Sequence, residues 1–395
     1  MKDKILKDFP IRIFALYVLF YSGQSIYNTY LNLYLNSVGL SESQIGVTVS
    51  VSTVGILIAQ IFWGMVSDRA KTKNRVLLFL YAVTAVVSLT FYLSRSFLFL
   101  IIAVTLFAVF FNPLVPLQDN FALEYLEGKK WDYGQVRMGG TIGYCITVLS
   151  IGFLLNDGYK QIFWMVALGM TLCFLICLGL PKIEGYRKPG HKSSYKELVK
   201  NKPLVGMILF NMIFSIGLNF YYNFYTIYFT SDKIGGNSSM VGVMMFISAV
   251  SEIPMLILIH KITEKIGLRK TLLAAGIVTS LRWLFLFILT DPIPIIAVNL
   301  VHGIGYTSFS YCIITYIGKT VPKDMRATGQ TMNVLIGNVI SKVLFGFIGG
   351  FASESFGADI IMLFSGFLMI AGTLIFAVWS RNIKELNVSQ GGNRL

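Results

Sequence analysis

Long apolar runs separated by short polar segments recur along the 395 residues of the chain. A helix needs about 20 apolar residues to cross the hydrocarbon core of a bilayer, and these runs have that length. Because 55% of the residues are hydrophobic and only 13% are charged, the fold class we predict is an all-α polytopic membrane protein surrounded by lipid bilayer. The twelve predicted transmembrane helices cover residues 11–36, 44–67, 75–93, 97–122, 135–156, 160–180, 203–230, 238–260, 268–288, 292–317, 326–353 and 358–380.

One polar stretch is long enough to divide the chain. Residues 182–203 read KIEGYRKPGHKSSYKELVKNKP and include seven basic residues. We therefore expect a basic cytoplasmic linker over 182–203, between an N-terminal half of six helices (1–181) and a C-terminal half of six helices (204–395). The loop after the second helix of each half has a similar pattern of charges, which indicates two pseudo-symmetric parallel halves.

The basic residues predict the topology. Of the 33 lysines and arginines, 27 fall in the N-terminal segment, the even-numbered loops and the C-terminal tail, and three (Arg95, Lys160, Lys233) fall in the opposite loops. Basic residues concentrate on the cytoplasmic side, so we expect a multi-pass protein of the cell (inner) membrane with both termini in the cytoplasm. The net charge of +14 is spread among short loops, which does not favour nucleic-acid binding.

Six ionisable side chains interrupt the apolar runs: Asp119, Arg137, Glu252, Arg282, His302 and Lys342. A charge at this depth costs roughly 3 kcal/mol, so such residues normally face a watery cavity or one another. This pattern is typical of a transporter. The sequence has no phosphate-binding loop, metal-ligand cluster or nucleophile elbow, so we expect no enzyme activity, no metal site and no cofactor, with the proton as the coupling ion.

A loop motif carries the first family resemblance. Residues 64–75 read GMVSDRAKTKNR, which resembles the G-x-x-x-D-R-x-x-R-R signature of the major facilitator superfamily and keeps Gly64, Asp68 and Arg69. The resemblance implies a loop that acts as a conformational latch. In physical terms, we expect a tight cytoplasmic loop in which Asp68 caps a helix or pairs across the bundle.

Five further strings resemble the branch that holds the lactose permease and the phenylpropionate permease type of proton symporter. They are NPLVPLQD (112–119), DYGQVRM (132–138), SAVSEIP (248–254), SLRWLF (280–285) and NLVHGIG (299–305). The resemblance implies that Asp119 and Arg137 contact substrate. The chain departs from the lactose permease at Gly305, where that permease has an acid, and lacks its acids on the seventh helix. Glu252 and Asp119 therefore remain as carboxylates at depth.

The residues suggest roles of their own. Asp119 and Arg137 lie on consecutive predicted helices and can form an ion pair. Glu252 is the candidate proton carrier, with Arg282 expected close enough to modulate it. His302 can relay a proton or hydrogen-bond the solute, and which of the two residues carries the coupling proton stays open. The predicted substrate-binding residues are Tyr27, Asn28, Asp119, Arg137, Tyr144, Asn219, Asn223 and His302.

These features predict a proton-coupled symporter that imports a small organic solute by alternating access. Three deep cations against two deep acids favour an anionic solute such as an aromatic or other organic acid, and a sugar (an oligosaccharide or galactoside) is the alternative. An uncoupled facilitator or a membrane solute sensor is a second possibility. Proton-antiport drug efflux is less favoured, because the fifth helix lacks a proline between Thr141 and Phe153. One chain contains both halves, so we expect a monomer.

Overall fold

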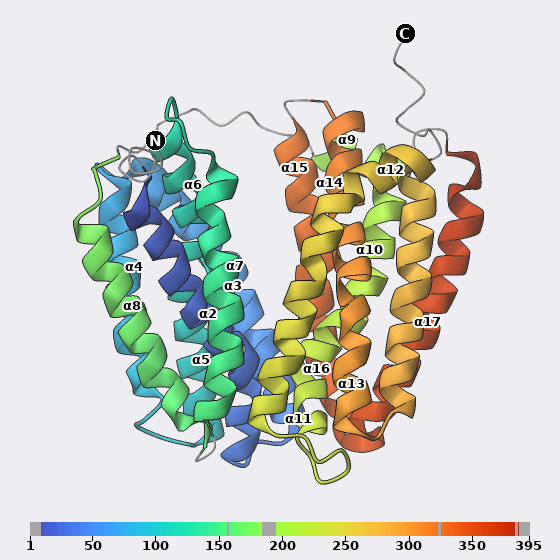
Figure 1. The fold of residues 1–395 in the computed structure, drawn as a ribbon, viewed down its shortest axis with the longest axis horizontal. Coiled ribbons are helices and arrows are strands. Elements are labelled where there is room, and N and C mark those ends of the chain that lie inside the picture. The colour runs from blue at the N-terminus through green and yellow to red at the C-terminus, as the bar shows by residue number, and fades with distance from the viewer. Residues whose placement is uncertain (1–8, 156–157, 184–194, 323–324, 384–385, 387–395) are drawn as a thin grey trace, which may run out of the picture. The chain divides into compact units, whose positions relative to one another are not determined.

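The computed structural model describes residues 9–155, 158–183, 195–322, 325–383 and 386, and this part of the chain is helical without strands (Figure 1). By internal packing it divides into two compact units. The first consists of Met1–Leu40 and Thr48–Pro189, and the second of Ser41–Val47 and Gly190–Leu395. Each unit is described separately below.

The helices of the first unit follow the predicted spans closely. Helix α3 begins in residues grouped with the second unit, and α5 with α6 form one span broken next to Pro113. The helices are α2 (Ile11–Ser37), α3 (Glu42–Arg69), α4 (Lys73–Thr90), α5 (Phe97–Phe111), α6 (Leu114–Leu126), α7 (Tyr133–Leu154), η1 (Tyr159–Gln161) and α8 (Ile162–Leu178).

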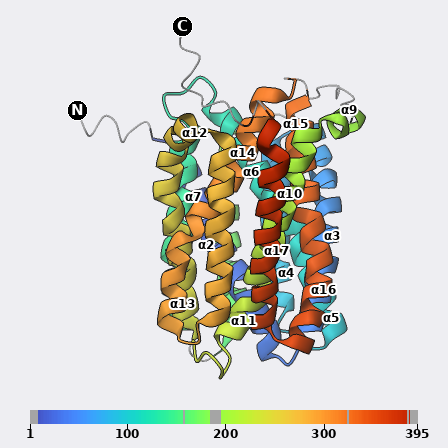
Figure 2. The same ribbon diagram turned by 90° about the vertical axis from the view of Figure 1, so that its right-hand side faces the viewer.

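The second unit contains more interruptions, including two segments of π-helix, η2 and η5. Its helices are α9 (Tyr195–Lys200), α10 (Lys202–Phe220), η2 (Tyr221–Tyr225), α11 (Thr226–Phe229), α12 (Ser238–Ile288), α13 (Pro292–Val298), η3 (Asn299–Val301), α14 (His302–Thr320), α15 (Arg326–Met332), η5 (Asn333–Ile340), α16 (Ser341–Phe356), α17 (Ala358–Trp379) and η6 (Ser380–Asn382). Within this unit α17 packs beside α10 (Figure 2).

The helices account for the twelve predicted spans. Ten helical segments of the described residues are long and apolar enough to cross a membrane. One of them, α12, contains Gly267 with a φ of 81°, a left-handed conformation that breaks the helix between the two spans predicted there. The remaining span is α2, which has 27 residues but is more polar than the other ten segments.

The predicted linker contains some helical structure of its own. Helix α9 lies inside the stretch 182–203, and α10 already begins at Lys202, where the Asn201 side chain accepts a hydrogen bond from the Leu204 N–H at 3.1 Å. An asparagine cap followed by Pro203 is a strong helix start, which explains the early beginning. Residues 184–194 of the predicted linker lie outside the described residues.

Glycines bring helices together in both units. In the first unit, a Cβ on Gly143 of α7 would collide with the Val18 carbonyl of α2, so the two backbones approach as only glycine allows. In the second unit, a Cβ on Gly303 of α14 would collide with the Ser251 carbonyl of α12. Helices α2 and α7, and likewise α12 and α14, therefore run side by side (Figure 1). Polar residues of each pair come into contact, such as Tyr21 with Arg137 and Glu252 with His302.

Candidate functional site

Four side chains of the first unit form a polar group that we call the Asp119 cluster: Tyr17 and Tyr21 on α2, Asp119 on α6 and Arg137 on α7. The Tyr17 hydroxyl donates to Asp119 Oδ1 at 2.8 Å, and Arg137 Nη2 donates to the Tyr21 hydroxyl at 2.5 Å. Arg137 Nε lies 3.7 Å from Asp119 Oδ1. The ion pair expected from the sequence is therefore present.

The Asp119 cluster keeps its charges partly accessible. The side chains of Asp119 and Arg137 are 26% and 30% exposed. The Arg137 guanidinium carbon lies 3.9 Å from the centre of the Tyr21 ring, so this ring supports the cation from one side. Gly140 permits this arrangement, because a Cβ there would lie 2.6 Å from Arg137 Nη1 and 2.7 Å from the Tyr21 ring. A guanidinium supported in this way can bind a carboxylate or a pair of hydroxyls through two N–H groups.

The other predicted binding residues of the first unit lie away from this cluster. Tyr27 is only 5% exposed, and its ring stacks on Phe107 with centroids 4.1 Å apart. Asn28 is exposed on α2, and Tyr144 is half-buried on α7, two turns beyond Arg137. A substrate role for these three residues stays a prediction, and for Tyr27 the packing in this structure leaves little surface to contact a solute.

The latch motif has a different local structure from the one expected. Asp68 and Arg69 are exposed in the last turn of α3, and α4 starts after Thr72 without a side-chain cap. Asp68 therefore does not cap α4, and the alternative, that Asp68 pairs across the bundle, stays a prediction. A Cβ on Gly64 would meet no atom within 4 Å, so this glycine is not required by packing here. The basic residue of this loop that is buried is Lys73, which forms an ion pair with Glu124 of α6.

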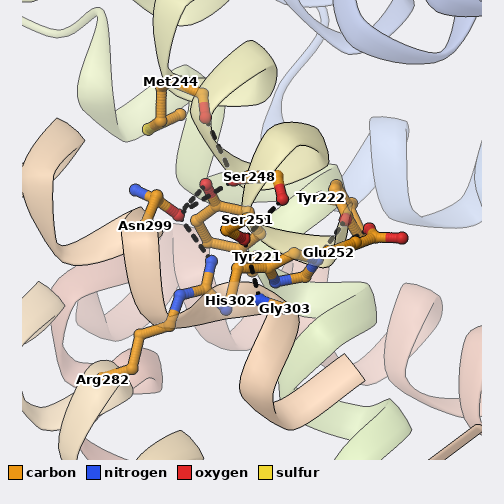
Figure 3. Close-up of polar contacts among 10 residues, drawn as sticks. All are labelled: Tyr221, Tyr222, Met244, Ser248, Ser251, Glu252, Arg282, Asn299, His302 and Gly303. Carbon is orange, nitrogen blue, oxygen red and sulfur yellow. Dashed lines mark hydrogen bonds and ion pairs between the residues drawn. The ribbon is translucent and has the colours of Figure 1, made fainter. Parts of the chain in front are cut away.

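The second unit holds a larger polar group, which we call the Asn299 cluster (Figure 3). The Asn299 side chain is fully buried, and its Oδ1 accepts hydrogen bonds from Arg282 Nη2 at 2.6 Å, the Tyr221 hydroxyl at 2.7 Å and the Ser248 hydroxyl at 3.3 Å. These donors come from both arms of α12 and from η2. One amide oxygen thus joins three helical segments.

Beside Asn299, the Glu252 carboxylate faces His302. The two side chains approach to 3.6 Å between His302 Nε2 and Glu252 Oε1. His302 is only 2% exposed, whereas the Glu252 side chain is 28% exposed. The Tyr222 hydroxyl contacts His302 Nε2 at 3.3 Å, and the Tyr306 ring stacks on the imidazole. A carboxylate and an imidazole at this distance can share and exchange a proton.

Arg282 bonds to a neutral side chain and not to a carboxylate. Its guanidinium is 3% exposed, donates to Asn299 and lies 4.4 Å from the centre of the Tyr221 ring. Among the described residues, no carboxylate lies within ion-pair distance of Arg282, and its Nε has no hydrogen-bond partner. Glu252 instead contacts His302, and a modulation of Glu252 by Arg282 stays a prediction. Helix α12 is bent at Gly267, which separates the two residues into different arms.

The π-helix η2 explains why two consecutive tyrosines serve this group. Tyr221 bonds to Asn299 while Tyr222 contacts His302, and these two partners are three residues apart on the neighbouring segment. In an α-helix, consecutive side chains point about 100° apart. The wider i→i+5 turn changes this register locally, and such turns often mark functional sites.

The predicted amides on the seventh span are placed differently. Asn219 is half-buried, and its carbonyl accepts a hydrogen bond from Asn223 Nδ2 at 2.8 Å. Asn223 is 8% exposed. Substrate contact by Asn219 and Asn223 stays a prediction.

Lys342 is half-buried on α16, and no described residue forms an ion pair with it.

The comparisons with known proteins agree with this architecture. The model of the MFS_1 like family matches residues 11–364. The chain belongs to this family. It is thus a multi-pass membrane protein of the major facilitator superfamily.

Relatives of this MFS_1 like chain transport different solutes by name. "Uncharacterized transporter YwbF" of Bacillus subtilis (strain 168) is 28% identical, with 84% of each chain covered. Maltose permease of Geobacillus stearothermophilus is 23% identical over 94% of each chain. "Probable 3-phenylpropionic acid transporter" of Escherichia coli (strain K12) is 23% identical, covering 76% of this chain and 80% of the relative.

Solved structures show the same fold. The crystal structure of nucleoside transporter NupG matches with a TM-score of 0.82 at 17% identity, covering 94% of this chain and 98% of that chain. At this identity the likeness concerns the fold alone. The family model and the named relatives, and not this likeness, make the chain a transporter, and its solute is a separate question.

Several residues that form these polar contacts were not predicted from the sequence. Asn299 stands one turn before His302 in the string NLVHGIG, so an asparagine on the same face as a deep histidine was an available signal. Ser248 and Ser251 precede Glu252 on the same helix, but serines on apolar helices commonly bond their own backbone and attract little notice. The pair of Lys73 and Glu124 joins residues 51 positions apart, which no local pattern indicates.

Proposed function

We propose that this protein is a proton-coupled symporter that imports a small organic solute by alternating access, with both termini in the cytoplasm. The observation that carries the proposal is the contact of Glu252 with His302 at 3.6 Å. No described lysine or arginine lies within ion-pair distance of the Glu252 carboxylate, so no fixed cation holds it ionised. A partly exposed carboxylate beside a buried imidazole is suited to load and release one proton.

The Asp119 cluster is the proposed solute-binding element of the first unit. Its guanidinium and carboxylate are both partly exposed, and two tyrosine rings flank them. Arg137 can bind a solute carboxylate through two N–H groups, whereas Asp119 and Arg137 together can bind the hydroxyls of a sugar. The relatives include a named maltose permease and a probable 3-phenylpropionic acid transporter, so both solute classes enter the proposal.

The charges at depth favour an organic acid over a sugar as the solute. Lys342 has no carboxylate partner among the described residues, while Asp119 is already paired with Arg137. An uncompensated charge at depth costs several kcal/mol, and an anionic solute supplies the missing negative charge. A sugar would leave this excess in place.

The test is uptake into proteoliposomes with an imposed inward proton gradient, using labelled phenylpropionate, maltose, lactose and a nucleoside in parallel. Glu252→Gln keeps the size of the side chain but cannot lose a proton. Glu264→Gln is the matched control, because Glu264 lies on the same helix and also faces a histidine, His260, at 3.3 Å, but is exposed.

We expect the gradient to stimulate uptake of one solute class several-fold. Glu252→Gln should abolish this stimulation, and Glu264→Gln should retain it, since only Glu252 faces a buried imidazole. If uptake by the unmodified protein does not depend on the proton gradient, the protein is instead a facilitator. Stimulation that survives Glu252→Gln would assign the proton to another residue.

A further inference from the structure

The partner of Arg282 is a neutral oxygen where a carboxylate would be the usual choice. Buried arginines are normally paired with an acid, because an isolated charge is expensive to bury. Here the guanidinium bonds to the Asn299 amide oxygen and lies over the Tyr221 ring, and neither group carries a charge that cancels its own. Its full positive charge therefore remains inside the second unit.

The Asn299 amide is fixed in one orientation. Its Nδ2 donates to the Ile295 carbonyl at 2.8 Å, which turns Oδ1 toward the donors of Arg282, Tyr221 and Ser248. An amide oxygen has two lone pairs, and the Ser248 hydroxyl has a second acceptor in the Met244 carbonyl at 3.0 Å. The two shorter bonds, from Arg282 and Tyr221, thus define the geometry.

His302 lies one helical turn after Asn299, the residue that binds this cation. The groups that face its imidazole are Glu252 from α12, Tyr222 from η2 and Tyr306 from α14, with Arg282 held through Asn299 on the preceding turn. A second positive charge on His302 would be repelled by Arg282 in this dry environment, where charge interactions are strong. Glu252 is the only carboxylate among these neighbours.

We propose that Asn299 is a positioning residue that holds Arg282 through a neutral oxygen and so leaves the guanidinium charge uncancelled. This charge keeps the His302 imidazole neutral. The exchangeable proton of the Glu252–His302 pair therefore resides on Glu252. An aspartate at this position would cancel the charge of Arg282. His302 could then become imidazolium and form a closed ion pair with the Glu252 carboxylate. The transport consequence rests on the proposed function, whereas the charge state of His302 does not.

The test measures that charge state directly. Protein labelled with ¹⁵N-histidine is placed in lipid nanodiscs, and the ring nitrogens of its three histidines are recorded at pH 6, with His302→Asn used for assignment. Neutral imidazole has one protonated and one bare nitrogen, whereas imidazolium has two protonated nitrogens. The variants are Asn299→Asp and, in case it fails to fold, Arg282→Gln, which keeps a donor for Asn299 but removes the charge.

We expect a neutral His302 in the unmodified protein and imidazolium in both variants. Asn211→Asp is the matched control, because Asn211 is a buried asparagine of the same unit that bonds to Asn333 and touches no cation in the described residues. His302 should stay neutral in this control. An imidazolium in the unmodified protein, or a neutral His302 in the folded variants, would overturn the proposal.

Transport supplies the second readout. We expect Asn299→Asp to lower gradient-driven uptake at least about tenfold, because a closed ion pair of Glu252 and His302 no longer exchanges its proton freely. If uptake by the unmodified protein does not depend on the proton gradient, the proposed symport is wrong. The ¹⁵N spectra of His302 then still test the role of Asn299. Unchanged gradient-driven uptake in Asn299→Asp would contradict the positioning role.

Discussion

Tyr17 and Tyr21 lie one turn apart on α2, yet their hydroxyls serve opposite charges. Tyr17 donates to the Asp119 carboxylate, and Tyr21 accepts from the Arg137 guanidinium. A hydroxyl can do either, which makes tyrosine suited to a site with an anion and a cation side by side. The two rings also stack with centroids 6.2 Å apart, and both are buried, so they support the two charges from within the unit.

Tyr21→Phe should weaken solute binding without unfolding the protein. The lost bond holds the Arg137 guanidinium in the orientation from which it would bind the solute, so we expect about a tenfold rise in KM, which corresponds to about 1.4 kcal/mol of binding free energy. The measurement is initial uptake rate against solute concentration. Tyr34→Phe is the control, since Tyr34 is on the same helix and its hydroxyl donates to a neutral group, the Phe91 carbonyl, at 3.3 Å. Equal KM values for both variants would exclude Tyr21 from the solute site.

At the scale of elements, the crossing of α12 and α14 positions the proton-exchanging pair. Gly303 follows His302 directly, and its N–H donates to the Ser251 hydroxyl at 2.9 Å, next to Glu252. The close approach of the two backbones therefore sets the distance between the Glu252 carboxylate and the imidazole. The 3₁₀ segment η3 ends at the same place and turns Asn299 toward Arg282.

Gly303→Ala should force these two helices apart. The new methyl group would collide with the Ser251 carbonyl, and overpacking of this kind costs about 1–3 kcal/mol. We expect a lower thermal unfolding midpoint in detergent and a loss of gradient-driven uptake. Gly318→Ala on the same helix is the control, because its Cβ would meet no atom within 4 Å. Equal unfolding midpoints for both variants would show that the close approach of the two backbones at Gly303 does not contribute to stability.

At the scale of the whole molecule, the distribution of basic residues predicts which loops face the cytoplasm. Arg95 precedes the span Phe97–Leu126 and Lys130 follows it, and both side chains are exposed. Since one span separates them, they should lie on opposite sides of the membrane. This arrangement is a direct consequence of the proposed orientation with cytoplasmic termini.

Single cysteines at these two positions test the orientation. The four native cysteines (Cys145, Cys173, Cys177 and Cys312) are first replaced by serine. In intact cells, a membrane-impermeant maleimide should label Arg95→Cys, and it should label Lys130→Cys only after permeabilisation. The reverse pattern would invert the topology while leaving the family assignment intact.

The sequence by itself determined the helical spans, the family and the set of ionisable residues at depth. Helix positions follow from the length and hydropathy of local segments, and a motif such as GMVSDRAKTKNR is also local. The break in α12 at Gly267, where φ is 81°, also lies in the gap between two predicted spans. Glycine adopts this left-handed conformation without a steric penalty, so a helix can end there. Such features do not depend on what packs against them.

Only the tertiary structure decided which of these residues meet. Glu252 faces His302, and Arg282 bonds to Asn299, whereas the sequence predicted Arg282 close enough to Glu252 to modulate it. The partners depend on the rotation of each helix and on how closely it packs against its neighbours, and here they depend on Gly303 and on the π-helical turn at Tyr221–Tyr225. Rotation and closeness are set by contacts between segments that are distant in the chain, so no local pattern contains them.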